Sequence, residues 1–168
     1  PFLQVLGKSC RIVPVLFGTP SVRNCRLFAD AIRAAAGRKR VLVCASTDLT
    51  HYPPYADARR IDLATLEKLK TMNVERLFDH LDAAEKQDDA PNLQTAMCAR
   101  GGVGTALLFA AAMGADRAEV LQYANSGDAP MGRKDGVVGY GAVLLVQSDP
   151  PAESGPPGAE GAGRLRRF

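Results

Sequence analysis

The residues whose types and spacing are suited to chemistry gather where a short apolar run ends, at Asp48 and His51. The run Val41–Ala45 is typical of a buried strand, and hydroxyl groups, a carboxylate and one of only two histidines follow it. Pro53 and Pro54 prevent an immediate helix, because proline has no backbone N–H to donate and pushes the preceding residue toward extended geometry. Open α/β sheets bind ligands in loops at the carboxyl ends of their strands, so Asp48 and His51 are the first candidates for a functional site.

A second polar constellation is the Met97–Gly104 segment, in which Cys98 precedes three glycines and the helical stretch Thr105–Met113. Glycines before a helix allow backbone N–H groups to approach a ligand, and a helix N-terminus favours negative charge. The thiol of Cys98 is therefore either a reactive thiolate, able to bind a metal or act as a nucleophile, or a buried structural thiol. The glycine spacing does not match the dinucleotide fingerprint, so we expect no nucleotide site here.

We expect Asp48, His51 and Cys98 to converge on one cleft, although Cys98 is distant in sequence. Asp48 and His51 follow a predicted central strand, and Cys98 directly precedes a helix that must pack back on the same sheet. The other histidine, His80, lies beside Asp79 on a predicted polar helix face. Such a histidine is more often solvated than a ligand, so we expect a solvated, slightly basic side chain away from the cleft.

The composition fits one globular domain. At 168 residues with 46% hydrophobic content, the chain is long enough for one sizeable core and too short for two ordinary domains. The net charge of +3 is spread over both halves, and the basic residues are not interleaved with aromatic ones, which argues against nucleic-acid binding. Four separated cysteines favour a reducing, cytoplasmic setting, and no apolar run resembles a signal peptide or a membrane span.

Strands and helices are expected to alternate along the chain. Apolar runs predict strands at Arg11–Phe17, Val41–Ala45, Glu119–Tyr123 and Val137–Val146. Apolar residues at helical spacing predict helices from a Ser21 cap to Gly37, from Asp57 to about Met72, from Asn73 onward, and over Thr105–Met113. This alternation predicts an α/β fold with three layers, α/β/α, around a mainly parallel or mixed central sheet.

The two ends of the chain differ in character. From Gln147 the composition changes to Pro, Gly, Ala and Ser, which cannot bury enough apolar surface to offset ordering. We therefore expect residues 148–168 to be a disordered tail. The chain opens without Met on the apolar sequence Pro1-Phe2-Leu3, which suggests a missing beginning.

Several motifs occur together in an order that resembles one family. They are Ser46-Thr47-Asp48-Leu49-Thr50-His51-Tyr52, Ala58-Arg59-Arg60-x-Asp62, Met97-Cys98-x-Arg100-Gly101, Tyr123-x-x-Ser126-Gly127-Asp128 and Val137-Val138-Gly139-Tyr140. From Pro1 to about Val146 the chain resembles the Memo family, protein B of the AmmeMemoRadiSam system, which is similar in fold to the class III extradiol dioxygenases of the LigB type. The resemblance implies a LigB-like domain whose N-terminal part is missing and whose C-terminal portion is residues 1–147.

The resemblance also implies roles for individual residues. His51 matches the histidine that serves as acid/base in the dioxygenases, Asp48 its neighbouring carboxylate, and Cys98 the family's cysteine metal ligand. Ser46 and Arg100 are assigned to substrate binding on the same basis. The implied cofactor is iron, with copper as the alternative. Because the family's other metal-binding histidines precede the sequence matched here, we expect this chain to be catalytically incompetent and at best a weak metal binder.

Two classes of function remain open. The first is a metal-dependent, dioxygenase-like oxidoreductase in which His51 moves a proton while Asp48 orients it. The second is a non-catalytic scaffold whose cleft binds a peptide, or the radical SAM protein and AMMECR1-like protein of the same system. The usual iron(II) triad of the oxygenases uses two histidines and one carboxylate. Because Cys98 replaces the carboxylate, the resemblance does not decide whether the reaction is an oxygenation. No nucleic-acid or membrane partner is expected.

Overall fold

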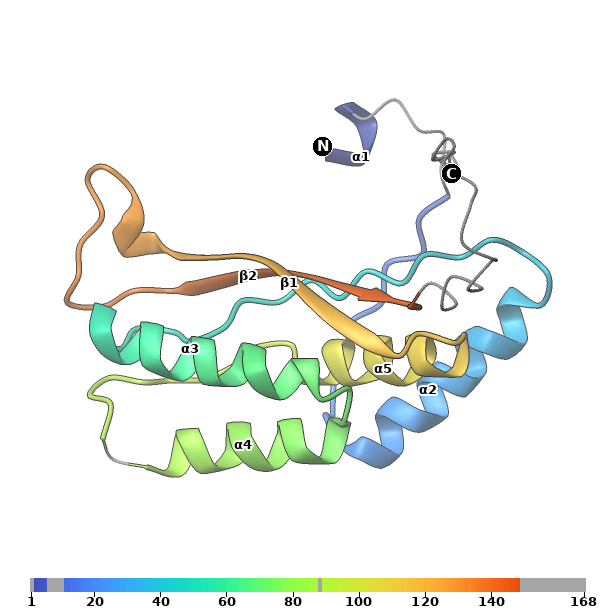
Figure 1. Cartoon of the computed structure of the whole chain (residues 1–168), viewed down its shortest axis with the longest axis horizontal. Coiled ribbons are helices and arrows are strands. Elements are labelled where there is room, and N and C mark those ends of the chain that lie inside the picture. Colours follow the sequence, from blue (N-terminus) through green and yellow to red (C-terminus); the bar gives the residue numbers. More distant parts are fainter. Residues whose placement is uncertain (1, 6–10, 88, 149–168) are drawn as a thin grey trace, which may run out of the picture.

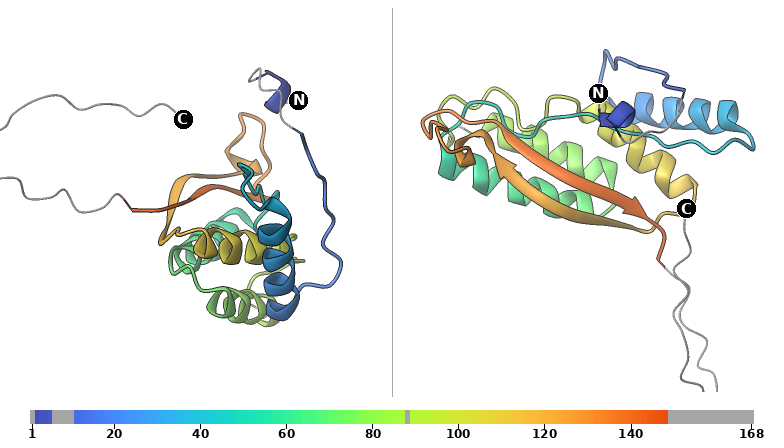
Figure 2. Two further views of the ribbon diagram at one scale, coloured as in Figure 1. Left: turned by 90° about the vertical axis from the view of Figure 1, so that its right-hand side faces the viewer. Right: turned by 90° about the horizontal axis from the view of Figure 1, so that it is seen from above.

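The computed structural model describes residues 2–5, 11–87 and 89–148. Helices come first along the chain and a strand pair follows (Figure 1). The elements are α1 (Phe2–Val5), α2 (Val22–Ala36), α3 (Tyr55–Lys70), α4 (Val74–Lys86), α5 (Arg100–Ala112), β1 (Arg117–Asn125), the short 3-10 helix η1 (Ser126–Asp128) and β2 (Gly139–Val146). The fold is therefore mixed α/β, as predicted, and α2 to α5 lie on one side of the β1–β2 pair (Figures 1 and 2).

The helix ends follow local capping chemistry. The Ser21 side chain accepts a hydrogen bond from the backbone N–H of Asn24 at 3.1 Å, and α2 ends at Gly37, whose φ of 54° suits glycine. At the start of α4, the Asn73 side chain accepts from the backbone N–H of Arg76 at 2.8 Å. The predicted starts of these two helices are confirmed, because each depends on residues a few positions apart.

Helix α5 begins at Arg100 rather than Thr105, so the glycines expected in a ligand-binding loop lie inside a helix. They permit close packing. A Cβ added at Gly104 would lie 3.0 Å from the Cys25 sulfur and 3.1 Å from a methyl group of Val74. A Cβ at Gly101 would overlap the ring of Phe17. These glycines let neighbouring elements approach α5, which is a packing role.

The sheet differs from the prediction. Within the described residues it has two strands, and β1 pairs antiparallel with β2 from Arg117 opposite Val146 to Asn125 opposite Gly139. The expected mainly parallel or mixed sheet, with helices on both faces, is not seen there. Consecutive strands joined without a crossover helix pair antiparallel, whereas parallel neighbours need a crossover of a dozen or more residues.

The predicted strands at Arg11–Phe17 and Val41–Ala45 are wrong for the described residues. Both segments are extended, but neither joins the ladder. Their apolar side chains are largely exposed: Val13 by 84%, Leu16 by 97% and Leu42 by 83%. An apolar, β-branched run favours extended geometry, but a strand also needs a neighbour to accept and donate its backbone hydrogen bonds.

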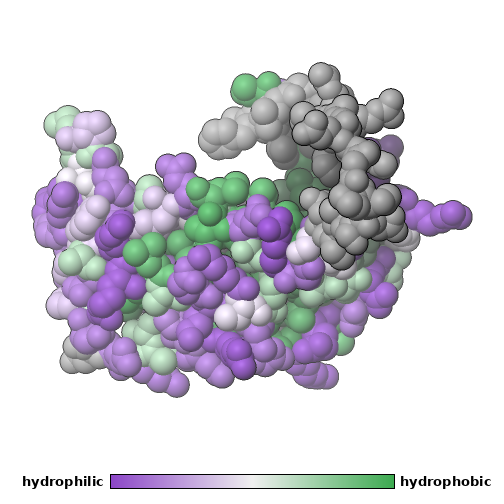
Figure 3. All heavy atoms as spheres, in the orientation of Figure 1, coloured by the Kyte–Doolittle hydropathy of each residue, from purple (hydrophilic) through white to green (hydrophobic). Residues whose placement is uncertain are grey.

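The core lies beneath the strand pair, among α3, α4 and α5. Its buried members include Leu66, Val74, Leu77, Leu81, Met97 and Leu107. The opposite side of the strand pair is more open, since Leu121 is 59% exposed and Leu144 is 47% exposed, and Figure 3 shows hydrophobic surface along the upper side of the molecule. Among the described residues, no helix is both long and apolar enough to span a bilayer. The expected tail lies outside the described residues from 149 onward.

Candidate metal centre

Asp48 and His51 lie on an extended segment that is fastened to the start of β2. The backbone N–H of Leu49 donates to the carbonyl of Gly139 at 2.8 Å, and the N–H of Gly139 donates to the carbonyl of Thr50 at 2.9 Å. The N–H of Tyr52 then donates to the carbonyl of Val137 at 2.7 Å. Residues 49–52 thus find the ladder partners that the preceding apolar run lacks.

His51 is held from its other side as well. Its backbone N–H donates to the carbonyl of Thr95 at 2.9 Å, and its carbonyl accepts from the N–H of Gln94 at 3.0 Å. His51 forms isolated bridges with both Thr95 and Val138, so its backbone lies between two neighbouring segments. Hydrogen bonds on both sides fix the position from which the imidazole projects.

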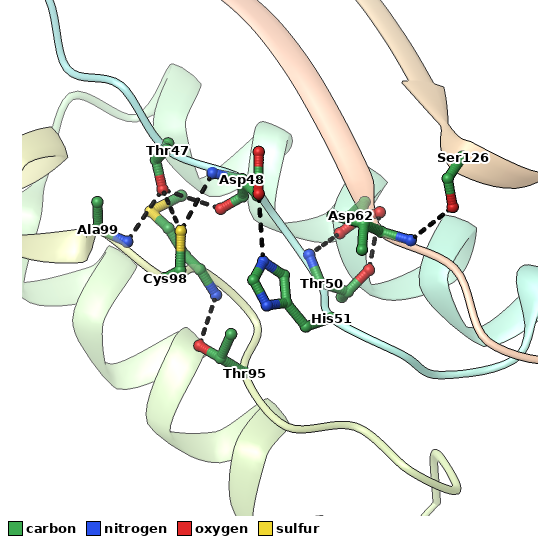
Figure 4. Close-up of polar contacts among 11 residues, drawn as sticks. Thr47, Asp48, Thr50, His51, Asp62, Thr95, Cys98, Ala99 and Ser126 are labelled. Atoms are coloured by element: carbon green, nitrogen blue, oxygen red, sulfur yellow. Dashed lines mark hydrogen bonds and ion pairs between the residues drawn. The ribbon is translucent and has the colours of Figure 1, made fainter.

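Cys98 is attached directly to Asp48. The N–H of Cys98 donates to the carbonyl of Asp48 at 3.3 Å, and the N–H of Asp48 donates to the Cys98 Sγ at 3.3 Å (Figure 4). The Thr47 hydroxyl lies 3.7 Å from the same sulfur and accepts from the N–H of Ala99 at 3.1 Å. Thr47 and Asp48 therefore position the thiol at the entrance to α5, and a backbone donor faces its sulfur.

The side chains of Asp48, His51 and Cys98 meet, and their predicted convergence is confirmed. One donor atom from each lies within 4.8 Å of the others. His51 Nε2 is 3.4 Å from Asp48 Oδ2, and the imidazole is 22% exposed beside a carboxylate that is 45% exposed. Cys98 is exposed, so it is not the buried structural thiol that the sequence left as an alternative.

The donor set fits a transition metal. The His51 Nε2 is buried and makes no hydrogen bond among the described residues, although buried polar atoms normally do; the Asp48 carboxylate at 3.4 Å is its ion-pair neighbour. A metal ion would satisfy it. Thiolate, imidazole and carboxylate are the ligand types that zinc, iron and copper take in proteins.

The chain matches the family model of the Memo-like proteins over residues 1–144. It belongs to the Memo-like family. It is 34% identical over 148 residues to a MEMO1 family protein of Methanopyrus kandleri, an alignment that covers 86% of this chain and 49% of the relative. It is 38% identical over 147 residues to a MEMO1 family protein of Ignicoccus hospitalis, with 85% and 48% covered. The chain spans about half the length of these curated relatives.

The two residues assigned to substrate binding take different places in this Memo-like chain. Ser46 is exposed two residues before Asp48. Arg100 does not join the group of three side chains. Its guanidinium is 14% exposed and forms ion pairs with Asp82 at 2.6 Å and Glu85 at 2.5 Å on α4. Arg100 therefore links α5 to α4 instead of presenting a free cation.

Glu85 is a residue that sequence reasoning missed. Its Oε1 accepts from the Thr95 hydroxyl at 2.9 Å and from the Ala96 N–H at 2.8 Å, while its Oε2 pairs with Arg100. The carboxylate thus fastens the segment that supports His51 and leads to Cys98. The sequence offered no signal beyond an acidic helix end.

The expectation that His80 is solvated is wrong, whereas its expected place away from the Asp48–His51–Cys98 group is confirmed. His80 is half-buried, and its Nε2 lies 3.0 Å from the Thr65 hydroxyl on α3. Burial lowers the pKa of His80, and the nearby Lys68 lowers it further. The packing of α4 on α3 turns His80 inward, so the ring is a packed side chain apart from the candidate metal centre.

Proposed function

We propose that this Memo-like chain carries part of a transition-metal site, formed by Asp48, His51 and Cys98, with iron or copper as the metal. The redox or dioxygenase-like chemistry of the site would belong to the complete protein, which supplies the remaining ligands. The observation that carries the proposal is the convergence of three donor groups within 4.8 Å: a thiol, a carboxylate and the buried Nε2 of His51, which makes no hydrogen bond within the described residues. A soft thiolate with imidazole suits copper(I) and iron as well as zinc.

Each residue contributes a distinct property to the site. Cys98 supplies the sulfur ligand, and the N–H of Asp48 that faces this sulfur stabilises negative charge on it. His51 supplies the nitrogen, and its backbone hydrogen bonds to the segments on both sides limit how the ring can move. When bound, the metal would supply Lewis acidity or electron transfer. Asp48 would supply the oxygen ligand when Nε2 binds the metal, and without the metal its Oδ2, 3.4 Å from Nε2, lies where it can orient the imidazole.

We further propose that the complete Memo fold is a three-layer, LigB-like α/β/α arrangement. Helices α2 to α5 cover one side of the strand pair, while Leu121 and Leu144 are exposed on the pair itself (Figure 1). A sheet with apolar residues on both faces is stable when both faces are covered.

The test is an anaerobic cobalt(II) titration of the reduced protein, because thiolate ligation gives cobalt(II) a charge-transfer absorption. We expect the native chain to show this absorption, and Cys98→Ser to lose it. Cys44→Ser is the matched control, since Cys44 is also an exposed free thiol but is not part of the group. Loss of the absorption in Cys44→Ser and its retention in Cys98→Ser would refute the assignment.

His51→Gln separates two roles for the histidine. If His51 ligates the metal, this variant should bind cobalt(II) at least about 10-fold more weakly, the lower end of what loss of even a second-shell partner costs a metal site. Unchanged affinity would assign His51 to proton transfer alone. If the native chain bound neither cobalt(II), iron(II) nor copper(I), the proposal would fail in favour of a scaffold that binds a peptide or the partner proteins of its system.

A further inference from the structure

Asp62 is a buried carboxylate at the junction of α3, β1, β2 and the extended segment that carries the candidate metal centre. It is 0% exposed. Its Oδ1 accepts from the backbone N–H of Thr50 at 2.9 Å, and its Oδ2 accepts from the Thr50 hydroxyl at 3.1 Å (Figure 4). Oδ2 also accepts from the Tyr123 hydroxyl at 2.9 Å. The carboxylate therefore takes three directed hydrogen bonds, two of them from one residue.

Thr50, which donates two hydrogen bonds to Asp62, directly precedes His51 in the chain. Thr50 is itself 0% exposed, and its carbonyl accepts from the N–H of Gly139 at 2.9 Å. Because its N–H, hydroxyl and carbonyl are all hydrogen-bonded, Thr50 is held in a single position and orientation. Since His51 follows it, the start of the imidazole side chain is fixed by the same bonds.

Two further features support the contact. Tyr123 donates to Asp62 while its oxygen accepts from the Asn125 side-chain amide at 3.3 Å, so the hydroxyl is oriented toward the carboxylate. At Gly139 on β2 the absence of a side chain makes room, because a Cβ there would overlap the Asp62 carboxylate. Glycine at position 139 therefore leaves the space that the Asp62 carboxylate occupies.

A buried carboxylate is an expensive way to fill space. Transfer of a carboxylate out of water is energetically costly, and hydrophobic residues of similar volume often serve stability equally well. Burial raises the pKa of Asp62 against the opposing effect of its hydrogen bonds from Thr50 and Tyr123. An apolar side chain at position 62 could not accept the hydrogen bonds that orient Thr50.

We propose that Asp62 is a positioning residue for the metal centre, which holds Thr50 so that His51 projects toward Asp48 and Cys98. This inference rests on the proposed metal-binding function. Loss of a group that orients a metal ligand typically costs about 10–100-fold in metal affinity. A residue that only stabilised the fold would lower the melting temperature and leave metal affinity unchanged.

The first experiment compares two tyrosine variants that each remove one hydroxyl donor to an aspartate. Tyr123→Phe removes the bond to Asp62, and Tyr55→Phe removes the 2.6 Å bond to Asp128, which is not part of the metal centre. Cobalt(II) affinity and hydrogen exchange at the His51 amide are measured in both. We expect Tyr123→Phe to weaken binding severalfold and to speed His51 exchange, while Tyr55→Phe changes neither. Equal behaviour of the two variants would overturn the proposal.

The second experiment changes the carboxylate itself. Asp62→Ala should lower cobalt(II) affinity by about 10–100-fold and shift the absorption spectrum of bound cobalt, whereas Asp62→Asn, which keeps an oxygen toward the Thr50 N–H, should recover part of the affinity. A folded Asp62→Ala variant with native affinity and spectrum would contradict the inference. If Asp62→Ala fails to fold, the tyrosine pair decides. If the native chain binds no cobalt, the proposed function fails, and His51 amide exchange alone tests the inference.

Discussion

Gly139→Ala adds a single methyl group, and the contacts around Gly139 predict that it lowers the stability of the chain substantially. The added methyl group would overlap the Asp62 carboxylate, and that carboxylate is enclosed and bonded to Thr50. Among the described glycines the positive φ angles belong to Gly37 and Gly114, so strain at Gly139 comes from the collision and not from the backbone. Overpacking costs about 1–3 kcal/mol. A displaced carboxylate also leaves a buried N–H unpaired, which costs about 1–3 kcal/mol more.

We therefore expect the free energy of unfolding to fall by about 2–6 kcal/mol, and the melting temperature by about 4–24 °C for a chain of this size. Chemical denaturation measures the first and calorimetry the second. Gly102→Ala is the matched control, because a Cβ at Gly102 meets nothing within 4 Å and the residue is helical. It should be neutral or stabilising by up to about 1 kcal/mol. A Gly139→Ala variant as stable as Gly102→Ala would refute the packing described around Asp62.

Three further predictions concern other parts of the chain. Because burial lowers the pKa of His80 below its ordinary 6.5, protonation favours the unfolded state. The free energy of unfolding should thus fall as the pH is lowered from about 7 to 5. Urea denaturation at each pH measures this decrease, which should be smaller in His80→Gln. The exposed Leu121 and Leu144 should promote self-association that sedimentation detects and lysine at both positions reduces. Removal of residues 149–168 should leave the melting temperature within a few degrees, since such a composition buries little.

Local chemistry made the helices predictable. The Ser21 and Asn73 caps and the Gly37 end are decided by residues within one turn of each helix boundary. Strand pairing was less accessible, because a ladder depends on which distant segment lies alongside. The run Val41–Ala45 has the composition of a buried strand, yet the residues that pair with the start of β2 are the polar ones that follow it. The glycines of α5 were misread because their close neighbours, such as Cys25 and Val74, are remote in sequence.

The candidate metal centre was predictable where it depends on residues that are close in sequence, and not where it depends on distant ones. Asp48 and His51 could be selected from three-residue spacing within one loop, and the meeting with Cys98 followed from topology and from the family resemblance. Long-range supports carried no comparable signal. Glu85 and Asp62 act through hydrogen bonds to Thr95 and Thr50, and nothing in the sequence around either acid indicates those partners.

X-ray absorption at the zinc edge tests the central claim most directly. The reduced protein, loaded anaerobically with one equivalent of zinc(II) well above the dissociation constant, should show one sulfur neighbour at about 2.3 Å and nitrogen or oxygen neighbours at about 2.0–2.1 Å. In Cys98→Ser the sulfur neighbour should be absent, and in Cys44→Ser it should remain. A zinc ion bound to the native chain with only oxygen and nitrogen neighbours would contradict a centre built from Asp48, His51 and Cys98.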